Sequence, residues 1–157
     1  CKFEYAFSGL QVHYSTATVR NSIFSNNYEG IRFSTTDVLI ENNDITNNYY
    51  GIRYEANGSR TTVRKNKITE NDNGFFPVQK SWDSVKIYDN NITNNKNYNV
   101  ILGMNQKRDL DYKGNWWGTA EAGQLEASLF DQTQDETLGR VHYAPFLTEP
   151  VRDCGMK

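Results

Sequence analysis

A repeat with a period of about 21 residues is the feature that most constrains how this chain can fold. Residues 19–33 align without a gap on residues 40–54, and further copies begin near residues 63 and 87. Equivalent apolar positions recur at similar intervals along the chain: Phe3, Phe24, Ile45, Ile68, Ile92 and Trp117. A short period of this kind is typical of solenoids, in which each unit buries its apolar face only against its neighbours.

Short runs inside each unit alternate apolar and polar residues, as in Ile31/Phe33 and Ile52/Tyr54. A period of two predicts strands. The Asn, Gly and Asp residues between these runs tolerate left-handed backbone and make tight bends. We therefore predict an all-β fold, a parallel β-helix of about six coils of 21–25 residues each. Residues 1–118 would form the coils, and residues 119–157 a cap and tail of the same domain.

Asparagine occurs 19 times and falls into two columns of the aligned repeat. The first column contains Cys1, Ser22, Asn43, Asn66, Asn90 and Asn115, and the second contains Asn27, Asn48, Asn71 and Asn95. Amides stacked at strand spacing can hydrogen-bond along the column and satisfy buried turn backbone. We interpret both columns as structural ladders. The alternative is sugar or metal binding, although amides offer no carboxylate for a hard cation.

The composition excludes some classes of function. A net charge of −2 and a pI near 5.7 argue against a nucleic-acid binder. No apolar run approaches the roughly 18–20 residues that span a membrane. No motif suggests a cofactor or a metal site. Hydrophobic residues make up only 37% of the chain, which fits a thin core partly lined by amides. The two cysteines do not make a disulfide scaffold; Cys1 and Cys154 could pair only if the tail ran back along the rod.

The pattern resembles the right-handed parallel β-helix proteins with short Asn-Gly-Ile repeats. This group includes NosD-like proteins and the carbohydrate-binding and sugar-hydrolase repeat group of the pectin-lyase-like superfamily. The segments 114–119 and 139–147, with Asp131 between them, resemble the closing segment of secreted bacterial and archaeal members. The resemblance implies a right-handed coil, the C-terminal portion of such a protein, and a secreted or cell-surface location. It implies no single function, because this superfamily includes lyases, hydrolases, epimerases and adhesins.

The two ends of the solenoid carry separate predictions. Residues 119–129 lose the strand pattern and predict a short amphipathic helix laid over the last coil. Trp116 and Trp117 are expected to cover the end of the core, with a sugar-stacking platform as the alternative. At the other end, Phe3 already belongs to a coil. We expect this end to be covered by upstream coils or by another protein chain. A lipid anchor on Cys1 is a further alternative.

Outward-pointing residues predict a ligand-binding face. Arg32 and Arg53 recur one coil apart, and arginine binds carboxylate or sulfate with paired donors, while aromatic rings stack on sugars. The predicted glycan-binding residues are Arg32, Arg53, Tyr28, Tyr49, Phe76 and Trp82. The alternative is an ordinary surface whose arginines pair with Glu29 or Glu41.

We identify no catalytic residue in the sequence. Glycoside hydrolysis needs two carboxylates, and the pairs Asp109/Asp111 and Asp131/Asp135 are explained by turns and caps. His13 and His142 lie far apart, with no Ser or Cys evidently placed for nucleophilic work. The sequence therefore favours a non-catalytic extracellular module, structural or polysaccharide-binding. Two alternatives stay open: the C-terminal part of a polysaccharide lyase or glycoside hydrolase, and an assembly component that docks another protein through its first coil.

Overall fold

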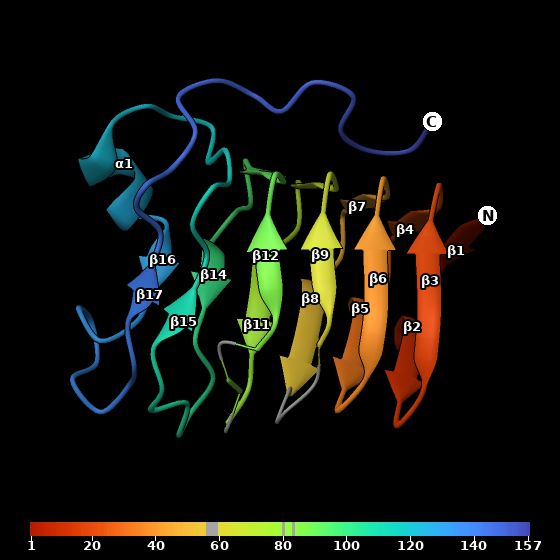
Figure 1. Ribbon diagram of the computed structural model, residues 1–157, viewed down its shortest axis with the longest axis horizontal. Helices are drawn as coiled ribbons and strands as arrows, with labels where there is room; N and C mark the ends of the chain where they lie inside the picture. The colour runs from red at the N-terminus through yellow and green to blue at the C-terminus, as the bar shows by residue number, and fades with distance from the viewer. Residues whose placement is uncertain (56–59, 80, 83) are drawn as a thin grey trace.

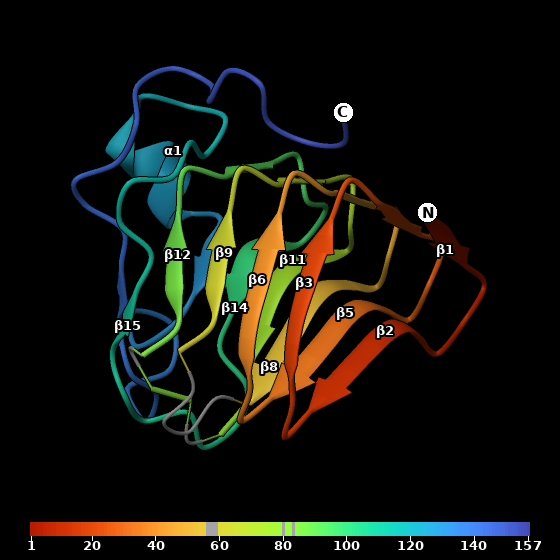
Figure 2. The ribbon, with the colours of Figure 1, turned by 45° about the vertical axis from the view of Figure 1, so that its right-hand side comes forward.

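The protein is a right-handed parallel β-helix, as predicted (Figures 1 and 2). The computed structural model describes residues 1–55, 60–79, 81–82 and 84–157. Three parallel sheets run along the rod. Sheet A contains β1 (Lys2–Glu4), β4 (Ile23–Ser25), β7 (Asp44–Thr46), β10 (Lys67–Thr69) and β13 (Asn91–Thr93). Sheet B contains β2 (Ser8–His13), β5 (Glu29–Ser34), β8 (Tyr50–Glu55), β11 (Asn73–Pro77), β14 (Tyr98–Ile101) and β16 (Leu129–Phe130). Sheet C contains β3 (Thr16–Arg20), β6 (Asp37–Glu41), β9 (Thr62–Arg64) and β12 (Lys86–Tyr88).

Four coils contribute a strand to all three sheets, rather than the predicted six or so. The fifth coil adds β13 and β14, but its third strand, β15 (Leu110–Asp111), pairs with β17 (Val141–His142) instead of β12. The backbone N–H of Leu110 donates to the carbonyl of Arg140 at 2.9 Å, and that of Tyr112 to His142 at 2.8 Å. β15 and β17 thus form a separate two-stranded sheet, and sheet C ends at β12.

The two asparagine columns form the predicted ladders at the bends between sheets. The side-chain Oδ1 of Asn66 accepts from both the backbone N and the Nδ2 of Asn43, each at 3.0 Å. Its own Nδ2 donates to the carbonyl of Ile40 at 2.9 Å and to Oδ1 of Asn90 at 3.0 Å. The same pattern repeats through the second column. Each amide therefore links two neighbouring coils and satisfies buried turn backbone.

The residue before each ladder position adopts left-handed backbone. Asn42 has a φ of 53° and Lys65 a φ of 53°, and Asn47 and Glu70 repeat this conformation in the second column. Asn and Asp adopt this conformation more readily than most residues. In pairs such as Asn42-Asn43 and Asn47-Asn48, the first asparagine therefore turns the chain and the second forms the ladder.

The core is a narrow set of inward rows, one from each sheet. Ile45, Ile52 and Ile40 are fully buried and represent the rows of sheets A, B and C. A glycine is the second residue of each of the strands β2, β5, β8 and β11 in sheet B. A Cβ added at Gly51 would lie 2.6 Å from the carbonyl oxygen of Gly74. This close approach lets the coils stack at strand spacing, about 4.8 Å.

The C-terminal segment closes one end of the rod. Its helix α1 (Ala122–Glu126) lies within the predicted range 119–129 and buries Leu125. Trp117 is buried in the core, whereas Trp116 is half-buried and bridges Asn91 and Leu147. In the part of the chain that the structure describes, no helix is long and apolar enough to cross a membrane.

The tail runs back along the rod toward the N-terminus (Figure 1). Val151 is held by the side chain of Asn91, and the Cys154 thiol donates to the carbonyl of Asn66 at 3.1 Å. In the first column Asn66 lies three coils from Cys1, or about 14 Å at strand spacing. A disulfide needs Cα atoms about 4–7 Å apart. Both thiols are accordingly free, although the tail takes the path that pairing would require.

Candidate functional site

The outer face of sheet B brings together most of the predicted ligand-binding residues. Arg32 and Arg53 are register partners on β5 and β8. Both approach the carboxylate of Glu29: Arg32 Nη1 lies 3.8 Å from Oε2, and Arg53 Nε lies 3.4 Å from Oε1. We call Glu29, Arg32 and Arg53 the arginine face. The pairing with Glu29 is the arrangement expected for an ordinary surface, so pairing alone does not make this face a binding site.

The electrostatics of the arginine face leave a surplus of positive charge. Glu29 is 2% exposed, and its Oε2 also accepts a hydrogen bond from Ser8 Oγ at 2.6 Å. The two arginine side chains are 32% and 23% exposed. Neither guanidinium donates a hydrogen bond to another described residue. One buried carboxylate therefore faces two cations, so the three side chains of the arginine face together carry a formal charge of +1; the carboxylate of Glu55 lies on the same face of β8, two residues after Arg53.

An aromatic column borders the arginine face. Ring centroids of Phe7 and Tyr28 are 4.9 Å apart, and those of Tyr28 and Tyr49 are 5.0 Å apart and nearly parallel. Because stacked rings cover each other's faces, the faces that Tyr28 and Tyr49 turn toward each other are not the open platforms predicted for sugar stacking. Their direct contribution to a ligand would be polar edges and hydroxyl groups.

Phe76 lies beside Arg53 in register but is not an open platform. Its ring stacks on Tyr50, with centroids 4.2 Å apart. Burial, followed by the neighbouring tyrosines, raises the pKa of Tyr50 to about 12, so this hydroxyl stays protonated in the physiological range. Phe76 and Tyr50 therefore form an apolar wall next to the cations.

Trp82 does not join this group. It follows β11 on the way to β12, and the guanidinium of Arg108 lies 4.3 Å from its ring centroid. No contact between Trp82 and the arginine face occurs among the described residues. Residues 80 and 83, which flank this position in the sequence, lie outside the described part of the chain. Trp82 instead ties its loop to the following coil.

Sequence reasoning missed a hydrogen-bonded chain on the same face of sheet B. His13 and Ser34 are register partners, and the ring Nδ1 of His13 contacts Ser34 Oγ. On the other side, Nε2 of His13 contacts the amide of Gln11. The expectation that no serine accompanies His13 is therefore wrong. The repeat period was the signal, because it places residue 34 beside residue 13.

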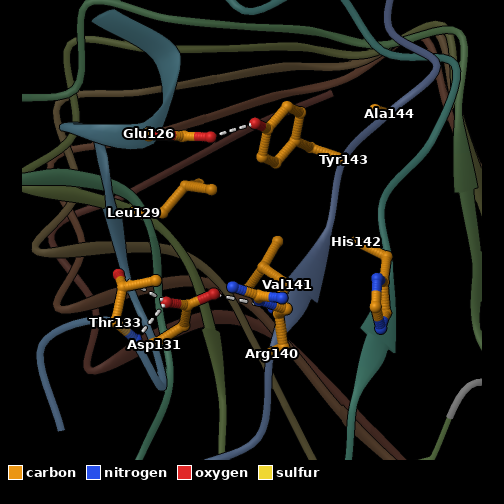
Figure 3. A pocket seen from close by; sticks show the side chains of 9 residues that line it. All are labelled: Glu126, Leu129, Asp131, Thr133, Arg140, Val141, His142, Tyr143 and Ala144. Carbon is orange, nitrogen blue, oxygen red and sulfur yellow. Dashed lines mark hydrogen bonds between the residues drawn. The ribbon is translucent and has the colours of Figure 1, made fainter. Parts of the chain in front are cut away.

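A pocket of about 340 Å³ opens at the C-terminal end, between α1, β16 and β17 (Figure 3). The Tyr143 hydroxyl donates to Glu126, and this hydrogen bond raises the pKa of Tyr143. The carboxylate of Asp131 is buried and accepts from the backbone of Thr133 and Val141, both at 2.9 Å. His142 points away from Tyr143 and pairs with Asp109 at 2.9 Å.

The chemistry of this pocket favours closure of the rod over catalysis. A lyase base needs an accessible group ready to accept a proton, and a raised pKa keeps Tyr143 protonated. A glycosidase needs a second free carboxylate, whereas both oxygens of Asp131 are engaged by backbone donors. Among residues 1–55, 60–79, 81–82 and 84–157, no cluster of three His, Cys, Asp or Glu side chains could hold a metal ion.

Comparison with known proteins places the repeat in one family. The family described as “Right handed beta helix region” matches residues 1–115. A stretch of 77 residues is 34% identical to Protein bark beetle of Drosophila melanogaster, covering 46% of this chain and 2% of that relative. The chain thus corresponds to a very small part of that protein. No solved structure matches the chain significantly.

Proposed function

Since this chain belongs to the right-handed β-helix family, we propose that it is a binding module that holds an acidic polysaccharide on the arginine face. The observation that carries this proposal is that two half-buried guanidinium groups, one coil apart on the same face, share a single buried carboxylate. Guanidinium groups bind carboxylate and sulfate with paired, charge-assisted hydrogen bonds. A protein of this function would act outside the cell or at its surface, where such polymers occur.

The scaffold supports recognition of a repeating polymer. Arg32 and Arg53 are held on adjacent strands, about 4.8 Å apart along the rod. Glu29 fixes both side chains, so less conformational entropy is lost when a ligand binds. The Tyr50–Phe76 wall provides apolar surface for the C–H face of a sugar beside the charged groups.

Binding of purified polysaccharides to the whole chain tests this proposal. We expect polygalacturonate to bind in low salt and dextran, a neutral glucan, not to bind, with affinity falling as salt rises. The double variant Arg32→Ala/Arg53→Ala should lose binding by at least tenfold. Arg64→Ala is the matched control, because Arg64 pairs with Glu41 on sheet C at 2.9 Å. Equal losses in both variants, or no binding to any acidic polymer, would refute the proposal.

The first coil favours a second candidate function, docking onto further β-helical coils. Tyr5, Phe7 and Tyr14 are among the most exposed large hydrophobic residues of the described part of the chain, and all belong to this coil. Such a partner would extend the Phe7–Tyr28–Tyr49 column and the edges of β1, β2 and β3. Light scattering across a concentration series tests self-docking: Phe7→Ser and Tyr14→Ser should dissociate any oligomer, and a monomer at all concentrations argues against it.

A further inference from the structure

Three polar side chains on the outer face of sheet B form one connected chain next to the arginine face. Gln11 and His13 are two residues apart on β2, so both leave the same face of the strand. Ser34 is the register partner of His13 on β5. The contacts run from the Gln11 amide to Nε2 of His13, and from Nδ1 of His13 to Oγ of Ser34.

This order of groups matches the requirements of nucleophilic catalysis. A serine hydroxyl becomes a useful nucleophile when a base within hydrogen-bond reach accepts its proton, and a third group orients that base. The same logic recurs on unrelated folds with different sequence spacing. Ser34 and His13 are both half-buried. A substrate can therefore approach Ser34, and the sheet restricts the movement of both side chains.

The amide of Gln11 decides whether His13 can act as a base. If Nε2 of Gln11 donates to Nε2 of His13, then Nδ1 carries the ring proton and cannot accept one from Ser34. A half-turn of the terminal amide presents Oε1 instead. His13 then carries its proton on Nε2, and Nδ1 is free to receive the Ser34 proton.

We propose that Ser34 and His13 are catalytic residues of an acyl-transfer site, with Gln11 as a positioning residue that selects the Nε2–H tautomer. The substrate class is O-acyl esters, and the choice of acylated acidic polysaccharides rests on the proposed function. Arg32 lies two residues before Ser34 on the same face of β5, so a uronate bound at the arginine face would carry its ester groups beside Ser34.

The reaction balances with water as its only co-reactant. Ser34 Oγ attacks the ester carbonyl carbon while Nδ1 of His13 takes the hydroxyl proton. Collapse of the tetrahedral intermediate breaks the ester C–O bond, and the sugar oxygen leaves with the proton from His13. Water then attacks the acyl-serine, its proton passes through His13, and the free carboxylic acid and the Ser34 hydroxyl are released.

Hydrolysis of p-nitrophenyl acetate, together with fluorophosphonate labelling located by mass spectrometry, tests the nucleophile. We expect labelling at Ser34, and a loss of at least about 100-fold in rate for Ser34→Ala and for His13→Ala. Ser15→Ala is the matched control, because Ser15 is exposed and lies two residues after His13 on the first coil. Circular dichroism verifies the fold of each variant. Equal rates for Ser34→Ala and Ser15→Ala, or labelling that survives His13→Ala, would overturn the proposal.

Two variants of Gln11 test the positioning role. Gln11→Glu replaces the amide by a carboxylate that can only accept from Nε2–H, and it should raise the rate. Gln11→Leu removes the partner and should lower it. Nitrogen NMR of the His13 ring should report the Nε2–H tautomer in the wild type and in Gln11→Glu. A ring protonated only at Nδ1, or no change in rate with either variant, contradicts the assignment.

The small ester separates this proposal from the binding function. Because p-nitrophenyl acetate carries no sugar, its hydrolysis does not require the arginine face. Hydrolysis without polygalacturonate binding would support the acyl-transfer site and refute the proposed polysaccharide function. Binding of polygalacturonate without hydrolysis or labelling would support the polysaccharide function and refute the acyl-transfer site.

Discussion

The inner and outer faces of sheet B follow different rules although the same strands build both. The inner column stays apolar from coil to coil: Leu10, Ile31, Ile52, Phe75 and Val100. The outer column changes from polar to charged to apolar: Gln11, Arg32, Arg53, Phe76 and Ile101. Stacking fixes the inner face, because each side chain must fill the space left by its neighbours. The outer face is free of that constraint, and there we locate the proposed polysaccharide site and the proposed acyl-transfer site.

The ladder should give the largest effect of any interior substitution. In Asn66→Ala, donors and acceptors of Asn43, Ile40 and Asn90 lose a buried partner. Each buried unsatisfied group costs about 1–3 kcal/mol, so we expect a loss on the order of 5 kcal/mol in the free energy of unfolding. Urea denaturation measures it. Asn97→Ala, at an exposed position, is the control, and a loss no larger than in that control would break the ladder account.

Two adjacent residues of β8 sharpen the comparison within one strand. Ile52 is fully buried, and Ile52→Ala should lower the free energy of unfolding by about 2–5 kcal/mol. Arg53 points outward, and Arg53→Ala should cost about 1 kcal/mol or less, since Arg32 and Ser8 still hold the buried Glu29 carboxylate. The same denaturation curves test both variants. A greater loss for Arg53→Ala would show that the outer face is structural.

The aromatic column should contribute less than the core. Tyr49 stacks on Tyr28 and meets the edge of Tyr50, with centroids 4.7 Å apart. Tyr49→Leu removes both ring contacts but keeps apolar volume, so we expect a loss of about 0.5–1.5 kcal/mol. Thermal unfolding followed by circular dichroism detects this change. If Tyr49→Leu also abolished polysaccharide binding while the fold persisted, the hydroxyl edge of Tyr49 would belong to the polysaccharide site.

The smallest effect on the free energy of unfolding is expected at the exposed pair of Asp109 and His142 in the C-terminal cap. Hydrogen bonds from the Arg140 backbone and from His142 hold the pKa of Asp109 below its ordinary value. A lowered pKa means that its stabilisation is present near neutral pH and is lost as pH falls through the lowered value, below about pH 4. Asp109→Asn should therefore reduce stability at pH 7 by less than about 1 kcal/mol. The wild type and the variant should converge in acid, and a difference that grows in acid contradicts this assignment.

The regular part of the molecule was predictable because stacking converts a sequence period into spatial neighbours. The period places Asn66 on Asn43 and Arg53 on Arg32, and both neighbours were identified correctly. Trp82 was misplaced because it lies in a longer loop, where the period no longer determines what packs beside it. The pairing of β15 with β17 was missed for a related reason: two short strands far apart in the sequence carry no repeat. Ser34 was predictable in principle, since it lies one repeat period after His13.

Titration of polygalacturonate oligomers into ¹⁵N-labelled protein, followed by amide chemical shifts, tests the central claim most directly. Three regions carry arginines in distinct settings: the arginine face on sheet B, Arg64 on sheet C, and Arg140 at the C-terminal pocket. We predict saturable shift changes centred on Arg32 and Arg53, with little change at Arg64 or Arg140. Changes centred on either of those two arginines, or no changes at millimolar oligomer, would contradict the claim that the outer face of sheet B binds acidic polysaccharide.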